Sequence, residues 1–254
     1  IMKNKKIRLA EKIDFENFES AEKQLLFYQE KIQKEFKINP FLTEELPGPG
    51  SIGYRVQNYG ITTWSKFFNP RQELVLSIFL LKIRECYKKM LDEKYDIEYA
   101  KILLTYLALN YDNLARKLTI FTRFRNDSNA FEGIFDIPNI HMIMDYGEKN
   151  ILKNNSDWMN GLESIIFAVS DITKIKNSKI HVTQGDATQL QFDDNYFDAV
   201  FTDPPYYDNI AYSYFSDFFY TRLKRTIGDL YPELFSTILV PRSSEIIVDG
   251  KTRD

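Results

Sequence analysis

Apolar side chains recur at helical spacing near the start of this 254-residue chain. In residues 11–37, Phe18, Leu25 and Ile32 stand among many charged side chains. A helix with this spacing gathers its apolar side chains on one side and leaves the charged ones in water. The pattern therefore predicts one long amphipathic helix at this end of the chain.

Capping residues and apolar spacing predict further helices. Asn69 followed by Pro70 is a strong helix start, because Asn is a favoured N-cap and Pro has the φ angle of the first helical position. This helix is expected to run to about Met90. Similar spacing predicts helices at residues 97–118 and 158–169.

The last third of the chain has a different pattern. Residues 179–183 and 197–202 read as strands, and residues 210–225 read as a helix. Strands that alternate with helices are typical of an α/β fold with a parallel sheet. Residues 120–155 show no clear period and are expected to be irregular.

A Pro-Gly-Pro-Gly stretch at residues 47–50 is the best candidate for a linker. We therefore predict an amphipathic helical segment at residues 1–46, a helical insertion at 47–155 and an α/β portion at 156–254. The chain begins with Ile1 rather than Met and stops shortly after an apolar segment. Both ends look like cuts through a longer protein, and a processed or engineered end would look the same.

Composition limits the classes of function. The chain is 44% hydrophobic and 27% charged, which is ordinary for a globular protein. A net charge of −3 gives no general attraction to nucleic acid, so such contact would need a local basic patch. Cys86 is the single cysteine, which excludes an internal disulfide and fits a reducing cytoplasm. The longest apolar run, residues 74–81, is too short to cross a membrane.

The clearest chemical signal is Asp203-Pro204-Pro205-Tyr206, directly after the predicted strand at residues 197–202. Two prolines cannot donate hydrogen bonds to a sheet, so they form a stiff, extended turn where the strand ends. The turn presents a carboxylate, a backbone carbonyl and an aromatic ring as one rigid group. Such a group suits a flat heterocycle with an amino group, which needs hydrogen-bond acceptors and a ring to stack on.

This tetrapeptide, called the double-proline motif below, resembles motif IV of the S-adenosylmethionine-dependent amino-methyltransferases. Residues 185–188 and 197–200 precede it in an order familiar from class I methyltransferases. Residues 207–220 and 229–235 are similar to the large prokaryotic adenine-specific DNA methylases, some of which carry a zinc ribbon. The resemblance implies an α/β fold with a partial Rossmann-like sheet and a largely helical N-terminal region.

The resemblance also implies roles for the motif. Asp203 and the carbonyl of Pro204 would accept hydrogen bonds from the target amino group, localising its lone pair for in-line attack on the cofactor's methyl group. Pro205 would stiffen the turn, and Tyr206 would stack on a base flipped out of the duplex. The substrate-binding residues implied are Tyr207, Asn209 and Tyr212.

Four residues are candidates for binding the cofactor. Asp186 and Ala187 follow a predicted strand, at the sheet edge where α/β folds bind ligands. By the resemblance, Asp186 would accept a hydrogen bond from adenosine, although a simple turn-capping role is an equal alternative. Arg71 and Gln72 lie at a predicted helix start, where free N–H groups attract anions. They are expected either to meet the cofactor's carboxylate or to cap the helix.

One element of a class I methyltransferase has no counterpart in the sequence, namely the Gly-rich turn that binds the cofactor. Gly48 and Gly50 alternate with prolines and follow no credible strand. In the resembling group this element lies before the matched region. We therefore expect a missing N-terminal region or a second chain to supply it. The zinc-ribbon cysteines are absent too, so no metal is expected.

The expected function is methylation of adenine N6 in DNA, with S-adenosylmethionine as the cofactor, in a cytoplasmic protein without membrane contact. An aspartate at the first position of the motif favours adenine. Cytosine N4, an RNA base and a protein glutamine amide remain open. A different class of function is a non-catalytic half of a split or degenerate methyltransferase, which would bind nucleic acid or a partner chain but no cofactor.

Overall fold

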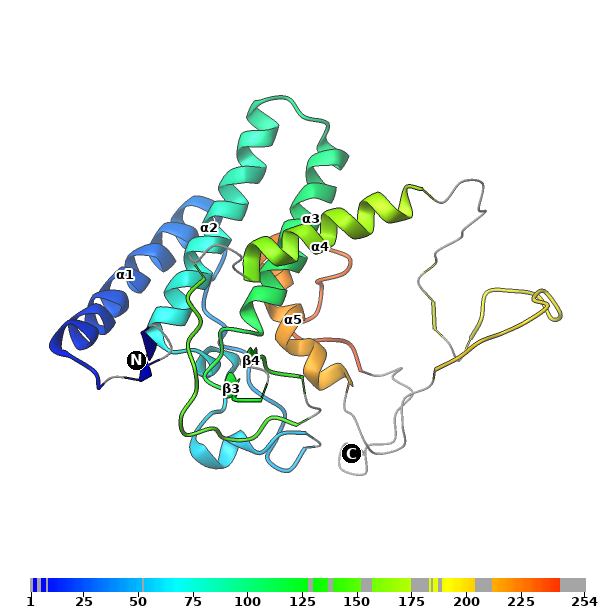
Figure 1. The fold of residues 1–254 in the computed structure, drawn as a ribbon. Helices are drawn as coiled ribbons and strands as arrows, with labels where there is room; N and C mark the ends of the chain where they lie inside the picture. The colour runs from blue at the N-terminus through cyan, green and yellow to red at the C-terminus, as the bar shows by residue number, and fades with distance from the viewer. Residues whose placement is uncertain are drawn as a thin grey trace.

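The computed structural model shows a largely helical body with short hairpins (Figure 1). The description below covers residues 2–3, 6–7, 9–51, 53–127, 130–136, 139–151, 157–174, 183, 185–186, 189–203 and 212–242. Within these residues the protein is mixed α/β, with far more helix than strand. The prediction of a largely helical N-terminal region is confirmed.

The body is built from α1 (Lys12–Phe36), α2 (Pro70–Asp92), α3 (Ile97–Ala115), α4 (Asp157–Ile172) and α5 (Tyr212–Ile227). Helix α1 lies along α2, and α2 and α3 form a hairpin (Figure 1). Helices α4 and α5 both pack against α3, and α5 also contacts α2. Each of these helices was predicted, with small differences at the ends.

Local hydrogen bonds explain where two of the helices begin. At α2, the Asn69 side chain accepts from the backbone N–H of Gln72, and the Gln72 side chain accepts from the N–H of Asn69, both at 3.0 Å. At α3, the Asp96 side chain accepts from the N–H of Tyr99 at 2.9 Å. These bonds satisfy N–H groups that have no partner within the first turn of a helix.

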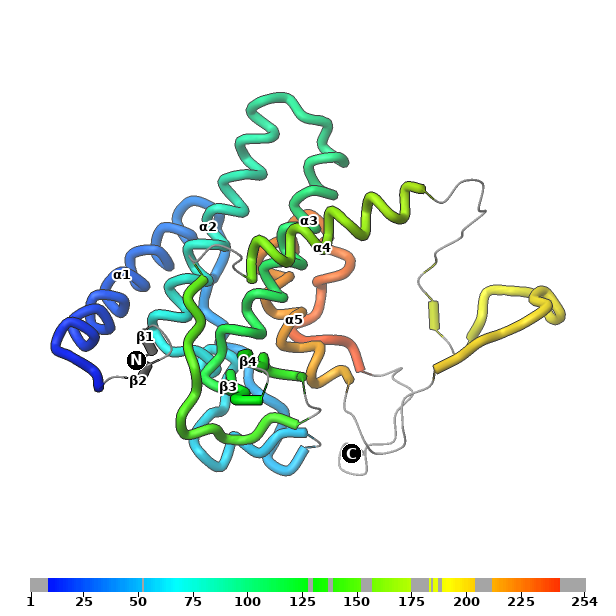
Figure 2. The backbone as a smooth tube through the Cα atoms, in the orientation of Figure 1, coloured from blue at the N-terminus to red at the C-terminus, as the bar shows by residue number. Residues whose placement is uncertain are grey.

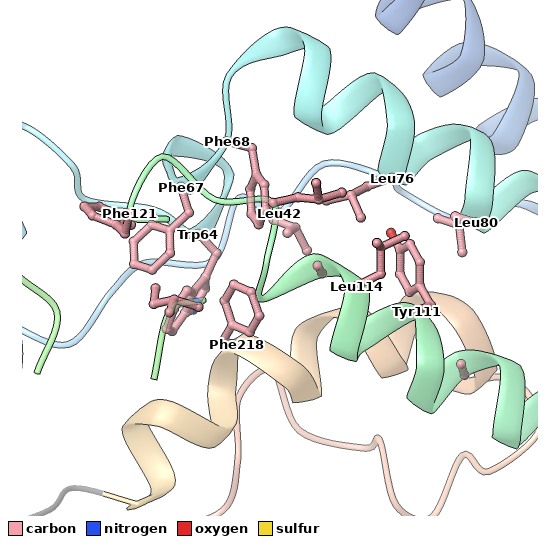
Figure 3. Close-up of a cluster of buried hydrophobic side chains, with 14 of the residues drawn as sticks. Leu42, Trp64, Phe67, Phe68, Leu76, Leu80, Tyr111, Leu114, Phe121 and Phe218 are labelled. Atoms are coloured by element: carbon pink, nitrogen blue, oxygen red, sulfur yellow. The ribbon is translucent and has the colours of Figure 1, made fainter. Parts of the chain in front are cut away.

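Buried aromatic side chains hold the body together (Figure 3). The short 3-10 helix η2 (Trp64–Phe67) places the Trp64 ring 5.0 Å from Phe67 and 5.7 Å from Phe218 of α5. Phe67 in turn lies 4.8 Å from Phe121, which follows α3. The rings meet edge to face, an arrangement that adds to the gain from burying their surface. This cluster joins the chain before α2 to the segment after α3 and to α5.

The hydrophobic core crosses the predicted domain boundaries. Ile32, Leu104 and Phe218 come from the three predicted regions and belong to one buried cluster. The expected linker at residues 47–50 also contacts the body, because the Gln57 side chain donates to the carbonyl of Pro47 at 2.8 Å. The division into three domains stays a prediction.

Two antiparallel hairpins account for the sheet structure in the described residues. Strands β1 (Met2–Lys3) and β2 (Lys6–Ile7) pair near the N-terminus. Strand β3 (Arg123–Arg125) pairs with β4 (Ala130–Glu132). The second hairpin contradicts the expectation that residues 120–155 are irregular. Three-residue strands are too short to show a period of two in the sequence.

The predicted parallel sheet is not formed by the described residues. Residues 197–202 make no strand, and Phe197, Val200 and Phe201 are 47%, 68% and 95% exposed. The prediction of a buried strand there is wrong for this structure. A strand needs a neighbour whose N–H and C=O groups pair with its own. Most of the other predicted strand, residues 179–183, lies outside the described residues.

Candidate functional site

Asp203 is the one residue of the double-proline motif that the structure describes, since residues 204–206 lie outside the described ranges. Its side chain is exposed, at the end of residues 189–203, which lie away from the helices in Figure 2. Asp203 lines neither the cavity beside Glu73 and Arg222 nor the one beside Phe121 and Ile134. The structure thus presents this carboxylate to water, outside both of these cavities.

The segment before Asp203 is ordered by contacts among its own rings. Phe192 stacks on Tyr196 at 5.0 Å and meets Phe197 at 4.7 Å. Asn195 adopts a left-handed φ of 62°, which Asn tolerates better than most residues, and the N–H of Tyr196 donates to the carbonyl of Asp193 at 3.2 Å. The rings remain 42% to 63% exposed, so this local order does not bury them.

Asp186 lies in an exposed turn. It forms an isolated antiparallel bridge with Gln189, whose N–H donates to the Asp186 carbonyl at 3.1 Å. Ala187 lies outside the described residues. This bond uses the backbone of Asp186, so the turn-capping role of its side chain and its role toward a cofactor both stay predictions.

Arg71 and Gln72 both have partners within the protein. The Arg71 guanidinium donates to a carboxylate oxygen of Glu148 at 3.0 Å and lies over the Phe18 ring at 5.2 Å. Gln72 is 3% exposed, and its side chain caps α2 together with Asn69. The capping alternative is therefore confirmed for Gln72. Contact with a cofactor stays a prediction for both residues.

The N-terminal end of α2 already holds an acidic group. The amide of Asn69 donates to the Tyr146 hydroxyl at 2.9 Å and to the carboxylate of Glu148. The Glu148 carboxylate thus already pairs with the Arg71 guanidinium, to which a cofactor carboxylate was expected to bind. A second carboxylate bound beside Arg71 would lie close to Glu148, and like charges repel.

Tyr212 is the first residue of α5 and is 46% exposed, whereas Tyr207 and Asn209 lie outside the described residues. The first turns of α5 are fixed on the body by Tyr54, whose hydroxyl donates to the carbonyl of Tyr214 at 2.8 Å. This bond joins residues far apart in the sequence, and sequence analysis did not predict it.

Asp217 of α5 is a buried acid to which sequence analysis assigned no role. Its carboxylate accepts from the N–H of Val240 at 2.9 Å and pairs with the Arg242 guanidinium. The available signal was an aspartate among the aromatic residues of a predicted core helix. A charge at such a position is rarely left without a partner.

A second group of polar side chains, buried or partly buried, lies between α2, α3 and α5. Glu73, Tyr111, Arg222 and Arg225 line a cavity with about 10 Å³ of room for water centres, close to what one water needs. Burial raises the pKa of Glu73 from 4.5 to about 7, and the positive charges of Arg222 and Arg225 oppose this rise. Burial also raises the pKa of Tyr111 to about 12.

The basic residues near the end of α5 belong to the body. Arg222 is 4% exposed and lies over the Phe68 ring at 4.3 Å. Arg225 pairs with Glu44 at 2.8 Å and donates to the carbonyl of Asn39 at 2.9 Å. With these partners, Arg222 and Arg225 are structural cations and not an open surface for phosphates.

No protein family, curated protein or solved structure matches this chain. In the described ranges, no three His, Cys, Asp or Glu side chains are grouped so that they could hold a metal ion. None of the helices described above combines the length and the apolar character that crossing a bilayer requires. The double-proline motif is therefore the feature on which a functional proposal depends.

Proposed function

We propose that this chain carries the target-base portion of an S-adenosylmethionine-dependent DNA methyltransferase that modifies the N6 amino group of adenine. The observation that carries the proposal is the motif Asp203-Pro204-Pro205-Tyr206, between an apolar run and a helix. The proposal includes a Rossmann-like fold, in which residues 197–202 pair as a strand of a parallel sheet.

The chemistry of the motif suits this substrate. An exocyclic amino group is a poor nucleophile, because its lone pair is delocalised into the ring. Asp203 and the carbonyl of Pro204 would accept hydrogen bonds from that group and localise the lone pair on nitrogen. Acceptors fixed in advance contribute more to the rate than acceptors that must first reorganise. The exposed Asp203 carboxylate is accessible to such a partner.

The exposed apolar segment supports the involvement of further polypeptide. Val200 and Phe201 are 68% and 95% exposed, which costs free energy unless another surface covers them. A sheet that includes residues 197–202 would cover both side chains and pair the backbone. We propose that the region bearing the Gly-rich turn supplies this sheet, either as part of a longer protein or as a second chain.

The residues expected to bind S-adenosylmethionine do not form a complete site by themselves. Gln72 is buried as a helix cap, Arg71 pairs with Glu148, and Asp186 lies in an exposed turn. The proposal therefore assigns most of the cofactor's binding to the Gly-rich region. Arg71 and Asp186 remain candidates for peripheral contacts.

Transfer of a labelled methyl group by the full-length natural protein tests the proposal. We expect Asp203→Ala and Tyr206→Ala to lower methyl transfer to duplex DNA by about 100-fold or more, because the acceptor and the stacking ring are lost. Asp194→Ala is the matched control, since Asp194 is an exposed acid of the same segment. Mass spectrometry of the modified base separates adenine N6 from cytosine N4. Full activity in both motif variants would refute the proposal.

A non-catalytic binding half is the second candidate function. It is favoured by one observation, which is that Asp203 lines neither cavity described above. Calorimetric titration of the full-length protein with S-adenosylmethionine separates the two candidates. Absence of heat at millimolar cofactor would favour the binding half over the enzyme.

A further inference from the structure

Arg222 is a buried cation whose side chain is incompletely hydrogen-bonded. Its guanidinium lies 4.3 Å from the centre of the Phe68 ring and 5.0 Å from that of Phe218. Its Nε and Nη2 atoms are shielded from solvent and have no hydrogen-bond partner among the residues that the structure describes. Buried donors of this kind cost free energy, and the cost is larger for a charged group. A ligand that accepts hydrogen bonds would therefore be stabilised beside Arg222.

The two nitrogens lie on the same edge of the planar guanidinium group. Their N–H groups point in nearly the same direction and form a fork that suits an anion. Arg222 also lines the cavity with about 10 Å³ of room for water centres, together with Ser77 and Tyr111. Figure 3 shows the Tyr111 ring directed toward Leu76 and Leu80, which line the same cavity. Ser77 and Tyr111 each carry a hydroxyl donor, so several donors surround a volume of one small atom.

The other charges around the cavity do not cancel that of Arg222 at mildly acidic pH. Arg225 lines the cavity, but its guanidinium pairs with Glu44 at 2.8 Å. Burial raises the pKa of Glu73 to about 7 and that of Asp112 well above 3.8, although the charge of Arg222 opposes both rises. At mildly acidic pH both acids are therefore largely protonated. The titratable and charged side chains around Glu73 come from α3, α5 and the segment between α1 and α2, and they are Tyr111, Asp112, Arg222, Arg225 and Glu44.

We propose that this cavity is a binding site for one chloride ion, held by the Nε and Nη2 groups of Arg222. Chloride accepts hydrogen bonds from several directions, so it can accept from the guanidinium and from neighbouring hydroxyls at once. It also supplies the negative charge that protonated Glu73 does not. The volume suits a single atom, which excludes phosphate and sulfate. The inference concerns the helical body and does not depend on methyl transfer.

Chloride and the ionised Glu73 carboxylate compete for the same positive charge. When only the protonated form of Glu73 admits chloride, the apparent affinity falls in proportion to the protonated fraction. With a pKa of about 7, about one tenth of Glu73 is protonated at pH 8 and nearly all of it at about pH 5.5. Chloride should therefore bind about tenfold more weakly at pH 8. By reciprocity, bound chloride should raise the pKa of Glu73 further.

Urea unfolding in sodium chloride measures this binding, because a ligand that binds only the folded protein stabilises it as its concentration rises. Sodium gluconate keeps the ionic strength constant, and gluconate is too large for the cavity. At about pH 5.5 the unfolding equilibrium constant should fall about tenfold when chloride reaches about ten times its dissociation constant. That dissociation constant should be about tenfold higher at pH 8. An unfolding constant that does not respond to chloride at about pH 5.5 would overturn the inference.

Glu73→Gln separates competition at the cavity from other effects of pH. The amide cannot ionise, so chloride should bind this variant equally well at both pH values. If the difference between the two pH values persists in Glu73→Gln, Glu73 does not compete with chloride and the inference is wrong.

Arg222→Gln removes the cation and should abolish the response to chloride at both pH values. Arg84→Gln is the matched control, since Arg84 is another buried cation of the body that lies outside the cavity lining and pairs with Asp229 at 2.7 Å. The control should be destabilised and yet keep the response to chloride. An equal response in Arg222→Gln and Arg84→Gln would contradict the assignment of the site to Arg222.

Crystallography of the wild type gives a test that does not depend on how well a variant folds. Crystals grown in chloride at about pH 5.5 should show the anomalous signal of one chloride ion within hydrogen-bond distance of Nε and Nη2 of Arg222. A peak without anomalous signal at this position would mean that the cavity holds water alone. That result, or the absence of any peak, would overturn the inference.

Discussion

Glu73 makes the stability of the body depend on pH. It lies in the first turn of α2, beside the water-sized cavity that Tyr111, Arg222 and Arg225 also line. Burial raises its pKa from 4.5 to about 7, despite the two nearby arginines. Because the folded protein holds this proton more tightly than the unfolded chain does, ionisation of Glu73 destabilises the fold.

The magnitude follows from the two pKa values. Between 4.5 and about 7 there are about 2.5 pH units, at about 1.36 kcal/mol each, which gives about 3 kcal/mol. Glu73 is partly exposed, and water screens part of its charge, so we expect about 1 to 3 kcal/mol. The contribution of protonated Glu73 to the free energy of unfolding is fully present below pH 4.5. It is lost as the pH rises through about 7. Glu73→Gln cannot ionise and therefore avoids this loss.

Urea unfolding of the wild type and of Glu73→Gln at several pH values between 4.5 and 8 measures this difference. We expect Glu73→Gln to be more stable by about 1 to 3 kcal/mol at pH 8, with the difference shrinking toward pH 4.5. Glu98→Gln is the control, since the Glu98 side chain is 73% exposed and should give no comparable trend. A difference that stays constant with pH, or a less stable Glu73→Gln at pH 8, would refute the reasoning.

The remaining predictions concern two glycines and one exposed aromatic side chain. Gly53→Ala should destabilise the protein by about 3 kcal/mol, because φ is +79° and a Cβ atom would lie 2.5 Å from the Phe215 ring. Gly60→Ala has a similar φ of +80° but open space, so thermal unfolding should show a loss of only about 1 kcal/mol. Phe201→Ser, at a side chain that is 95% exposed, should change the stability of this chain by less than about 0.5 kcal/mol, yet abolish methyl transfer by the full-length protein.

The sequence predicts the helices because their signals are local. The reciprocal hydrogen bonds between Asn69 and Gln72 join residues three positions apart. The start of α2 can therefore be predicted from residues that are close together in the sequence. The hairpin of β3 and β4 depends instead on pairs across the strands, such as Phe124 and Phe131 at 5.1 Å. Such pairs leave no periodic pattern in strands of three residues.

The predicted strand at residues 197–202 shows a different limit. An apolar run predicts that a segment is buried, but it does not identify the part of the protein that covers the segment. Without a paired neighbour in the described residues, Phe201 stays in water. The same holds for the candidate site, of which one part can be predicted from the sequence and another cannot. The double-proline motif can be read directly, whereas the bond from Tyr54 to Tyr214 joins residues 160 positions apart and requires the structure.

The contacts of α5 fix both ends of this helix on the body. One end of the helix is fixed by Tyr54, Asp217 and Arg242, and the other by the ion pair between Arg84 and Asp229. The segment before the helix, by contrast, exposes its apolar side chains up to Asp203. A well-anchored helix and an uncovered apolar segment are both expected if further polypeptide provides the sheet that the proposed function requires.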